Sequence, residues 1–194
     1  MTPLGRSTKV ETMRTKQVVG LLAAAIFALG ADARAVESSL GVELGYVKAK
    51  AVDSTLVFGG DFRFHVAKAF ALAPEFSYWK KSQSGLGITS SVEDLQFGVK
   101  AVGVYRPNRT LELFAGAGGG VHHFTGNLGV LGGSALSDSV TKGGVDVLAG
   151  LDVKAGDNLS FFMSARYDWI LGTEGDDTTR LDQKKFTGGF RVRF

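Results

Sequence analysis

Apolar and polar residues alternate with period two along most of the chain, most regularly in residues 185–194. There every second residue is apolar or small, and the residues between them are polar or small; the first set is Phe186, Gly188, Phe190, Val192 and Phe194. Successive side chains of a β-strand point to opposite faces, so this pattern predicts a strand with one apolar and one polar face.

The same alternation recurs in seven further segments of residues 36–194. They cover residues 39–48, 57–66, 70–79, 92–106, 110–124, 142–154 and 159–171. No segment of this region shows a helical period longer than two turns. The pattern therefore predicts an all-β domain of eight strands.

The connections between these predicted strands differ in length in a regular way. Three are tight and carry turn residues such as Pro, Gly, Asn and Asp: 67–69, 106–109 and 155–158. Three others are longer and polar or rich in glycine: 80–91, 125–141 and 172–184; the connection at 49–55 is intermediate. Long and short connections alternate, which predicts an antiparallel up-and-down meander with its long connections at one end.

Composition and charge narrow the function classes. The chain has no cysteine, so neither disulfides nor thiolate metal sites are available. Its net charge of +3 comes from residues 1–35, because residues 36–194 contain 17 basic and 17 acidic residues. A neutral domain gives no reason to expect nucleic-acid binding.

The N-terminal region reads as a secretory signal peptide. Arg14 and Lys16 precede an apolar run at 18–29, and Ala33-Arg34-Ala35 is a small-x-small cleavage site. A run of this length is too short to span the ~30 Å hydrocarbon core of a bilayer. We therefore expect residues 1–35 to be an N-terminal extension and signal peptide, and residues 36–194 to be the mature domain.

The C-terminal strand resembles the C-terminal signal of bacterial outer-membrane β-barrels. Thr187, Gly189, Val192 and Phe194 stand where that family has a polar residue, a glycine, an apolar residue and a terminal aromatic. The resemblance implies that these four residues form an assembly signal read by the outer-membrane barrel-assembly machinery.

Over residues 36–194 the chain resembles the small eight-stranded outer-membrane barrels, the OmpA-transmembrane-like and OmpX-like group. The implied fold is an all-β, eight-stranded, antiparallel up-and-down transmembrane β-barrel, located in the outer membrane. Lacking a long apolar run after residue 35, the chain can span a membrane only as a closed barrel. We expect no peptidoglycan-binding domain after Phe194, in contrast to full-length OmpA proteins.

In a membrane barrel the apolar face meets lipid and the polar face fills the lumen. Aromatic residues are then expected in two belts, at the loop end (Tyr46, Phe58, Tyr78, Tyr167, Trp169, Phe186) and at the turn end (Phe64, Phe70, Tyr105, Phe161, Phe194). The competing architecture is a soluble eight-stranded barrel of the lipocalin kind. That barrel needs a strongly charged outer face, whereas here half of the polar face is Gly, Ala and Ser.

The predicted lumen is rich in charge. Its acids are Glu43, Asp61, Glu75, Asp94, Glu112, Asp146, Asp152 and Asp168, and its bases are Arg63, Lys100, Lys154, Arg166, Lys185, Arg191 and Arg193. Unpaired buried charges are costly, so we expect ion pairs and hydrogen-bonded networks. Because an eight-stranded barrel is only wide enough for side chains to fill, the lumen is predicted to be a polar plug rather than a pore.

No catalytic, metal-binding or cofactor-binding residues are predicted. His122 and His123 are adjacent on a strand, so one should face the interior and the other the rim, and they cannot share a metal ion there. The sequence also offers no convincing nucleophile, base and orienting group together. The loop at 125–141 is partly apolar, through Leu128, Val130, Leu131 and Leu136, and the loop at 172–184 is acidic, through Glu174, Asp176, Asp177 and Asp182.

Three function classes follow. The first is a non-enzymatic, monomeric structural or surface-interaction barrel with a filled lumen, whose extracellular loops meet lipopolysaccharide, a host ligand or other cells. The second is a porin-family protein that lets small apolar molecules pass, which a resemblance to OmpW-like barrels would imply. The many lumen charges count against this function. The third, a lipid-modifying barrel enzyme, is disfavoured by the histidine analysis. We expect the first.

Overall fold

The computed structural model describes residues 37–49, 52–85, 88–130, 136–171 and 182–194. Within them the ordered elements are eight strands: β1 (Ser38–Ala49), β2 (Val52–Ala67), β3 (Phe70–Gly85), β4 (Ile88–Tyr105), β5 (Leu111–Val130), β6 (Leu136–Lys154), β7 (Leu159–Ile170) and β8 (Gln183–Arg193). No helix among the described residues is long and apolar enough to cross a membrane. The predicted signal peptide at 1–35 lies outside the described residues.

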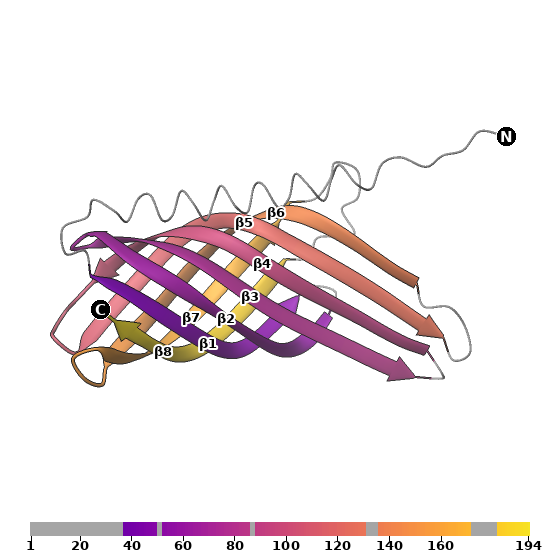
Figure 1. Ribbon diagram of the computed structural model, residues 1–194, viewed down its shortest axis with the longest axis horizontal. Coiled ribbons are helices and arrows are strands. Elements are labelled where there is room, and N and C mark those ends of the chain that lie inside the picture. The colour runs from indigo at the N-terminus through magenta and orange to yellow at the C-terminus, as the bar shows by residue number, and fades with distance from the viewer. Residues whose placement is uncertain (1–36, 50–51, 86–87, 131–135, 172–181) are drawn as a thin grey trace. The chain divides into compact units, whose positions relative to one another are not determined.

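Each strand pairs antiparallel with the next, and β8 pairs with β1, so the sheet closes on itself (Figure 1). The closing ladder runs from Ser39 opposite Arg193 to Ala49 opposite Gln183. Closure leaves no unpaired strand edge, which is the main liability of an isolated sheet. The predicted all-β, eight-stranded, up-and-down barrel is confirmed.

The outward-facing and inward-facing residues of the barrel wall are those that the alternation predicts. The predicted aromatic residues of both belts lie on the outward face, exposed or half-buried. The fifteen predicted lumen charges lie on the inward face; all are buried except Asp61 and Lys154, which are half-buried. Apolar groups therefore cover the outside and polar groups the inside, the reverse of a water-soluble barrel.

The strands extend further than the sequence predicted, and the prediction of a long loop is wrong for residues 80–91 and 125–141. Of the loop predicted at 172–184, residues 172–181 lie outside the described residues. Residues 80–91, expected to be a loop, mostly belong to β3 and β4, which pair as far as Gly85 opposite Ile88. The segment 125–141 mostly belongs to β5 and β6 in the same way. Ladder hydrogen bonds do not need apolar side chains, so polar strands beyond the apolar band look like loops in the sequence.

As a result, β3 to β6 project beyond the ends of the other strands (Figure 1). On this projection, hereafter the outer extension (residues 80–85, 88–93, 125–130 and 136–141), the outward face is no longer apolar. Its outward positions are mainly polar: Lys80, Ser82, Ser84, Thr89, Ser91, Glu93, Thr125, Asn127, Ser137, Ser139 and Thr141. Its inward positions are mixed: Val92, Leu128, Leu136 and Val140 are apolar, whereas Lys81, Gln83, Ser90 and Asp138 are polar. The polar outer surface indicates that this part of the wall stands in water rather than in lipid.

The interior is not purely polar, which corrects the prediction of a polar plug. One apolar cluster, hereafter the outer apolar cluster, lies towards the outer extension and consists of Val47, Ala49, Val57, Trp79, Phe124 and Ile170. A second lies towards the other end and consists of Ala71, Ala73, Val102, Val104, Phe114, Leu148 and Phe162. The charged residues therefore share the interior with two apolar clusters.

Candidate functional site

The middle of the barrel interior is organised around Glu75 on β3. Both of its carboxylate oxygens accept hydrogen bonds from Arg166 on β7, at 3.0 and 2.7 Å, and it forms an ion pair with Lys100 on β4. Lys100 also lies 3.2 Å from Asp146, and Arg166 lies 3.6 Å from Glu43. Fork-shaped pairing with both oxygens of a carboxylate is the geometry that guanidinium groups favour. This group connects strands from opposite sides of the barrel.

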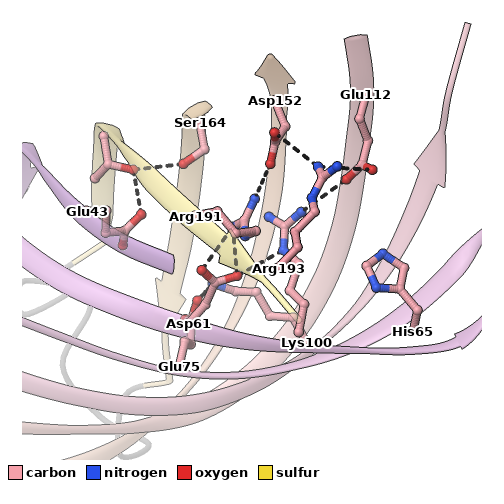
Figure 2. Close-up of polar contacts among 12 residues, drawn as sticks. Glu43, Asp61, His65, Glu75, Lys100, Glu112, Asp152, Ser164, Arg191 and Arg193 are labelled. Carbon is pink, nitrogen blue, oxygen red and sulfur yellow. Dashed lines mark hydrogen bonds and ion pairs between the residues drawn. The ribbon is translucent and has the colours of Figure 1, made fainter. Parts of the chain in front are cut away.

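A second network lies on the turn side of the first, and Arg191 on β8 holds it together (Figure 2). The Arg191 guanidinium donates to Asp61 at 2.9 and 3.0 Å and to Asp152 at 2.6 Å. Arg193 donates to the other oxygen of Asp152 at 3.2 Å and lies 3.5 Å from Glu112. Every charged group in this network has an opposite charge beside it, as buried charges require.

Arg63, which lies 2.9 Å from Asp61, and Arg191 also stack on aromatic rings of the second apolar cluster, hereafter the inner apolar cluster. The Arg63 guanidinium carbon lies 4.1 Å from the centre of the Phe114 ring, and that of Arg191 lies 4.4 Å from the Phe162 ring. A guanidinium over an aromatic face gains from cation–π attraction while its edge remains free to donate hydrogen bonds. The inner apolar cluster and the charged network are therefore packed against each other rather than separated.

A third network, which lies towards the outer extension, contains the interior histidine. The His122 ring nitrogen Nδ1 lies 2.9 Å from Asp94, which also accepts a hydrogen bond from Gln183 at 2.8 Å. Gln183 in turn accepts from the Trp79 indole at 3.2 Å. Nearby, Lys185 lies 2.9 Å from Asp168. The polar network thus continues directly into the outer apolar cluster through Trp79.

The four residues of the predicted assembly signal lie on both faces of β8. Thr187 points inward and donates to Glu43 at 2.7 Å, while Val192 and Phe194 are exposed on the outward face. Gly189 has a packing reason of its own, because a β-carbon there would lie 1.9 Å from the backbone oxygen of Val42. The close approach of β8 to β1 at this point therefore requires glycine.

The histidines occupy the predicted faces. His122 is buried inside, and His123 is exposed and lies 3.0 Å from the Thr141 hydroxyl. His65, which the sequence analysis did not assign a role, is buried near the turn end. There its Nε2 accepts from Arg106 at 3.3 Å, so its Nδ1 carries the proton and donates to the Glu37 backbone oxygen at 2.9 Å.

Arg106 closes the turn end of the barrel. It lies just beyond β4 and donates to Glu112 at 2.8 Å and to Glu37 at 3.2 Å. Burial alone would lower the pKa of Arg106, but the hydrogen bond and charge of Glu112, with those of Glu37, hold it above the usual arginine range. Beside it, the turns at this end line an open hollow of about 750 Å³ that also includes Arg109 and Lys154.

A small cavity lies between these networks. It lies among Glu43, Asp61, Glu75, Lys100 and Arg191, and its volume is about 20 Å³. A volume of this size is close to that of one water molecule. Among the residues that the structure describes, no group of three His, Cys, Asp or Glu side chains lies close enough together to hold a metal ion.

A closed antiparallel barrel with an apolar outward face, aromatic rings near both ends and a charged interior is the architecture of a bacterial outer-membrane protein. Comparison with known families agrees: residues 19–194 match the outer membrane protein beta-barrel domain, and the chain belongs to this family. No curated protein sequence matches the chain significantly.

Solved structures show the same fold. A complex of Ail, the attachment invasion locus protein of Yersinia pestis, with the heparin analogue sucrose octasulfate is 19% identical, covers 82% of this chain and 99% of that one, and has a TM-score of 0.57. Neisserial surface protein A is 18% identical, with 81% and 97% covered and a TM-score of 0.59. A major outer membrane protein from Thermus thermophilus is 12% identical, with 83% and 100% covered and a TM-score of 0.64. At these identities the similarity shows the fold alone.

Proposed function

We propose that this outer-membrane barrel is a structural or surface-interaction protein that acts through the part of its wall beyond the bilayer, with a closed lumen. The observation that carries the proposal is the density of pairing across the interior. Arg166 and Glu75 bridge opposite walls, Arg191 joins two carboxylates, and a cavity of about 20 Å³ lies between these groups. A continuous file of water would have to break several buried ion pairs, which is costly.

The outer extension supplies the interaction surface. Its outward positions carry mainly hydroxyl side chains, which can both donate and accept hydrogen bonds. Surfaces of this kind suit saccharides, such as those of lipopolysaccharide or of a host cell surface. For the related Ail barrel, the bound heparin analogue is itself a sulfated sugar, and we propose ligands of the saccharide class for this chain as well.

The same proposal includes the route to the membrane. We propose that residues 1–35 are removed after export, that the barrel-assembly machinery recognises Thr187, Gly189, Val192 and Phe194, and that the inserted barrel is a monomer without enzymatic activity. The support is the signal-peptide pattern and the placement of Val192 and Phe194 on the exposed face of the last strand.

The experiment that tests the interaction surface shortens one hairpin in register. Thr125 pairs with Ser139, so replacing residues 126–138 by Asn-Gly leaves a paired hairpin with a favourable turn. We expect this variant to fold and insert, with the heat-dependent gel shift of the parent, and to lose binding to cells or to the lipid-free saccharide of lipopolysaccharide. A second variant shortens the other hairpin of the outer extension and replaces residues 83–90 by Asn-Gly between the paired Ser82 and Ser91. Undiminished binding by both shortened barrels would reject the interaction function.

A second function, passage or capture of small apolar molecules, has one observation in its favour. The inward face of the outer extension carries the exposed side chains of Leu128, Leu136 and Val140, next to the outer apolar cluster. Below that cluster, however, the interior is charged, so an apolar molecule would have to leave through the wall. Single-channel recordings in planar bilayers separate the two functions: a steady conductance in the parent protein would favour passage over the closed lumen that we propose.

A further inference from the structure

The outward face of the barrel has a groove within its apolar band. The groove has a volume of about 440 Å³ and is lined by β1, β8, β7 and β6, which are consecutive around the wall. Small residues, Ala149, Ala165 and Gly188, form part of its lining, and larger apolar side chains stand around them; these are Leu44, Tyr46, Leu151, Met163 and Phe186. On a surface that faces lipid, a groove of this kind fits an acyl chain.

Two lysines stand at the outer end of this groove. Lys48 follows Tyr46 by two residues on β1, and Lys184 precedes Phe186 by two residues on β8, so both lysines share the outward face with the groove. The separation along each strand is about 7 Å. Lys48 and Lys184 are directly opposite in the ladder, and both are exposed.

Lys48 and Lys184 place two positive charges side by side on the outward face. Like charges directly opposite each other destabilise an antiparallel pair. Among the described residues, neither lysine forms an ion pair with a carboxylate, and Lys184 instead lies 6.0 Å from the centre of the Tyr167 ring. Lys80, also exposed at the outer end, differs in lying 3.4 Å from Glu93. The position of Lys48 and Lys184 is therefore suited to an anion that comes from outside the chain.

The height of the pair on the barrel identifies the kind of anion. Tyr46, Tyr167, Trp169 and Phe186 form the belt at the outer end, and Lys48 and Lys184 lie level with this belt or beyond it. Aromatic belts mark the boundary between hydrocarbon and headgroups, so the two ammonium groups reach the headgroup layer of the outer leaflet.

We propose that the groove and the Lys48–Lys184 pair together bind one phosphorylated acyl glycolipid of the outer leaflet, of the lipid A class. The phosphate would lie between the two ammonium groups and an acyl chain would lie in the groove. A phosphate monoester carries about −1.5 to −2 charges at neutral pH and can neutralise both lysines, whereas a phosphodiester headgroup carries one charge. This charge match favours lipid A over a phospholipid. The site is on the barrel wall and is independent of the surface function proposed for the outer extension.

The charge part of the proposal is tested by lipid binding to the full-length barrel, refolded in detergent micelles. Native mass spectrometry would count bound lipid A across a titration. We expect Lys48→Ala or Lys184→Ala to weaken binding about fivefold, and the double variant about 30-fold, as losing one or two headgroup-level cations implies. The matched control, Lys80→Ala, removes a lysine that already has a carboxylate partner and should leave binding within about twofold of the parent.

The groove part is tested by filling it. A β-carbon at Gly188 would lie 3.5 Å from the Phe162 backbone oxygen, an ordinary contact, so Gly188→Leu should place its side chain in the groove without disturbing the wall. The control is Gly103→Leu, at an exposed glycine elsewhere on the outward face, where a β-carbon would lie 3.6 Å from the Ala115 oxygen. We expect the first variant to weaken lipid A binding and the second to leave it unchanged.

Competition experiments with a phospholipid and with inorganic phosphate distinguish the possible sources of the bound phosphate. Phosphatidylglycerol should bind more weakly than lipid A, and inorganic phosphate should not displace lipid A, because it has no acyl chain. Unchanged lipid A binding by the Lys48→Ala, Lys184→Ala double variant would overturn the proposal, and so would equal retention of phosphatidylglycerol. Because both lysines are exposed, these variants should refold like the parent, and the lysine arm decides the proposal even if Gly188→Leu folds poorly.

Discussion

Arg166 on β7 and Glu75 on β3 meet across the barrel interior, where Nη1 donates to Oε1 at 3.0 Å and Nη2 donates to Oε2 at 2.7 Å. Because β3 and β7 are four strands apart in a closed ring of eight, this pair joins opposite walls. It therefore connects opposite walls at the middle of the barrel and neutralises two buried charges.

The first prediction concerns this pair. Glu75→Gln removes the carboxylate that faces Arg166 and Lys100, leaving two buried cations with less compensation. We expect a loss of about 3–5 kcal/mol in the free energy of unfolding, measured by urea titration of the refolded barrel. Glu93→Gln is the control, because its lysine partner is largely exposed and such pairs contribute about 0–1 kcal/mol. Similar losses in the two variants would show that the cross-lumen pair is not a major source of stability.

How much of this site the sequence could reveal depends on the kind of relationship. The alternation of polar and apolar residues was sufficient to place Glu75 and Arg166 on the inward face, because the face of a strand residue depends only on the phase of this alternation. Their contact could not be predicted, since it depends on strand tilt and stagger around the whole barrel. The same holds for Lys48 and Lys184, whose like-charge pairing appears only once the ladder between the first and last strands is known.

Two other features were missed for physical reasons that differ. Trp79 and Phe124 occupy the inward phase of their strands, so the sequence did contain the signal for an apolar cluster inside the lumen. The assumption that this face is uniformly polar hid it. The outer extension left no such signal: strands outside the bilayer need no apolar outward face, so its serines and threonines were taken for loops.

The second prediction tests where the bilayer ends. Met163 is 66% exposed on the outward face of β7 and lies in the apolar band. Met163→Arg places a charge in lipid and should cost about 2–4 kcal/mol if the position is near the midplane. Ser139→Arg, an outward position of the outer extension, should change stability by less than about 0.5 kcal/mol. Unfolding in vesicles of two acyl-chain lengths is the measurement, and only the Met163 variant should depend on bilayer thickness.

The third prediction concerns assembly. Phe194 directly follows β8 at the turn end and is exposed, so its ring supports little of the interior packing. If it belongs to an assembly signal, Phe194→Ser should accumulate in the periplasm and be degraded in cells, although the purified variant refolds in detergent as the parent does. Phe161→Ser, another exposed aromatic near the turn end, is the control and should assemble. Normal yields of heat-modifiable barrel from Phe194→Ser would remove the basis for the assembly signal.

The fourth prediction concerns processing at the N-terminus. Ala33-Arg34-Ala35 after the apolar run at 18–29 implies cleavage before Val36. Intact-mass measurement of protein extracted from outer membranes should therefore give a chain that begins at Val36. Ala35→Leu should slow cleavage because signal peptidase sites require small residues there. A membrane-inserted chain that still contains residues 18–29 in the parent protein would contradict this prediction.

The last prediction uses the two tryptophans, which report on opposite sides of the wall. Trp79 is 2% exposed, lies in the outer apolar cluster and donates to Gln183, whereas Trp169 is 42% exposed on the outward face in the outer aromatic belt. Trp79→Phe leaves Trp169 as the single fluorophore, and Trp169→Phe leaves Trp79. Each substitution keeps an aromatic ring, so both variants should fold.

In vesicles that contain brominated lipids, Trp169 should be quenched, and more strongly by bromine near the headgroup than by bromine near the chain end, since belt residues sit at the interface. Trp79 should be quenched weakly by brominated lipids at any depth, because the barrel wall lies between it and the bilayer, and weakly by aqueous iodide, because the cluster excludes solvent. Strong lipid quenching of Trp79 would reverse the assignment of faces. Strong iodide quenching of Trp79 would instead show that the outer cluster admits water, which would count against the closed lumen proposed for this barrel.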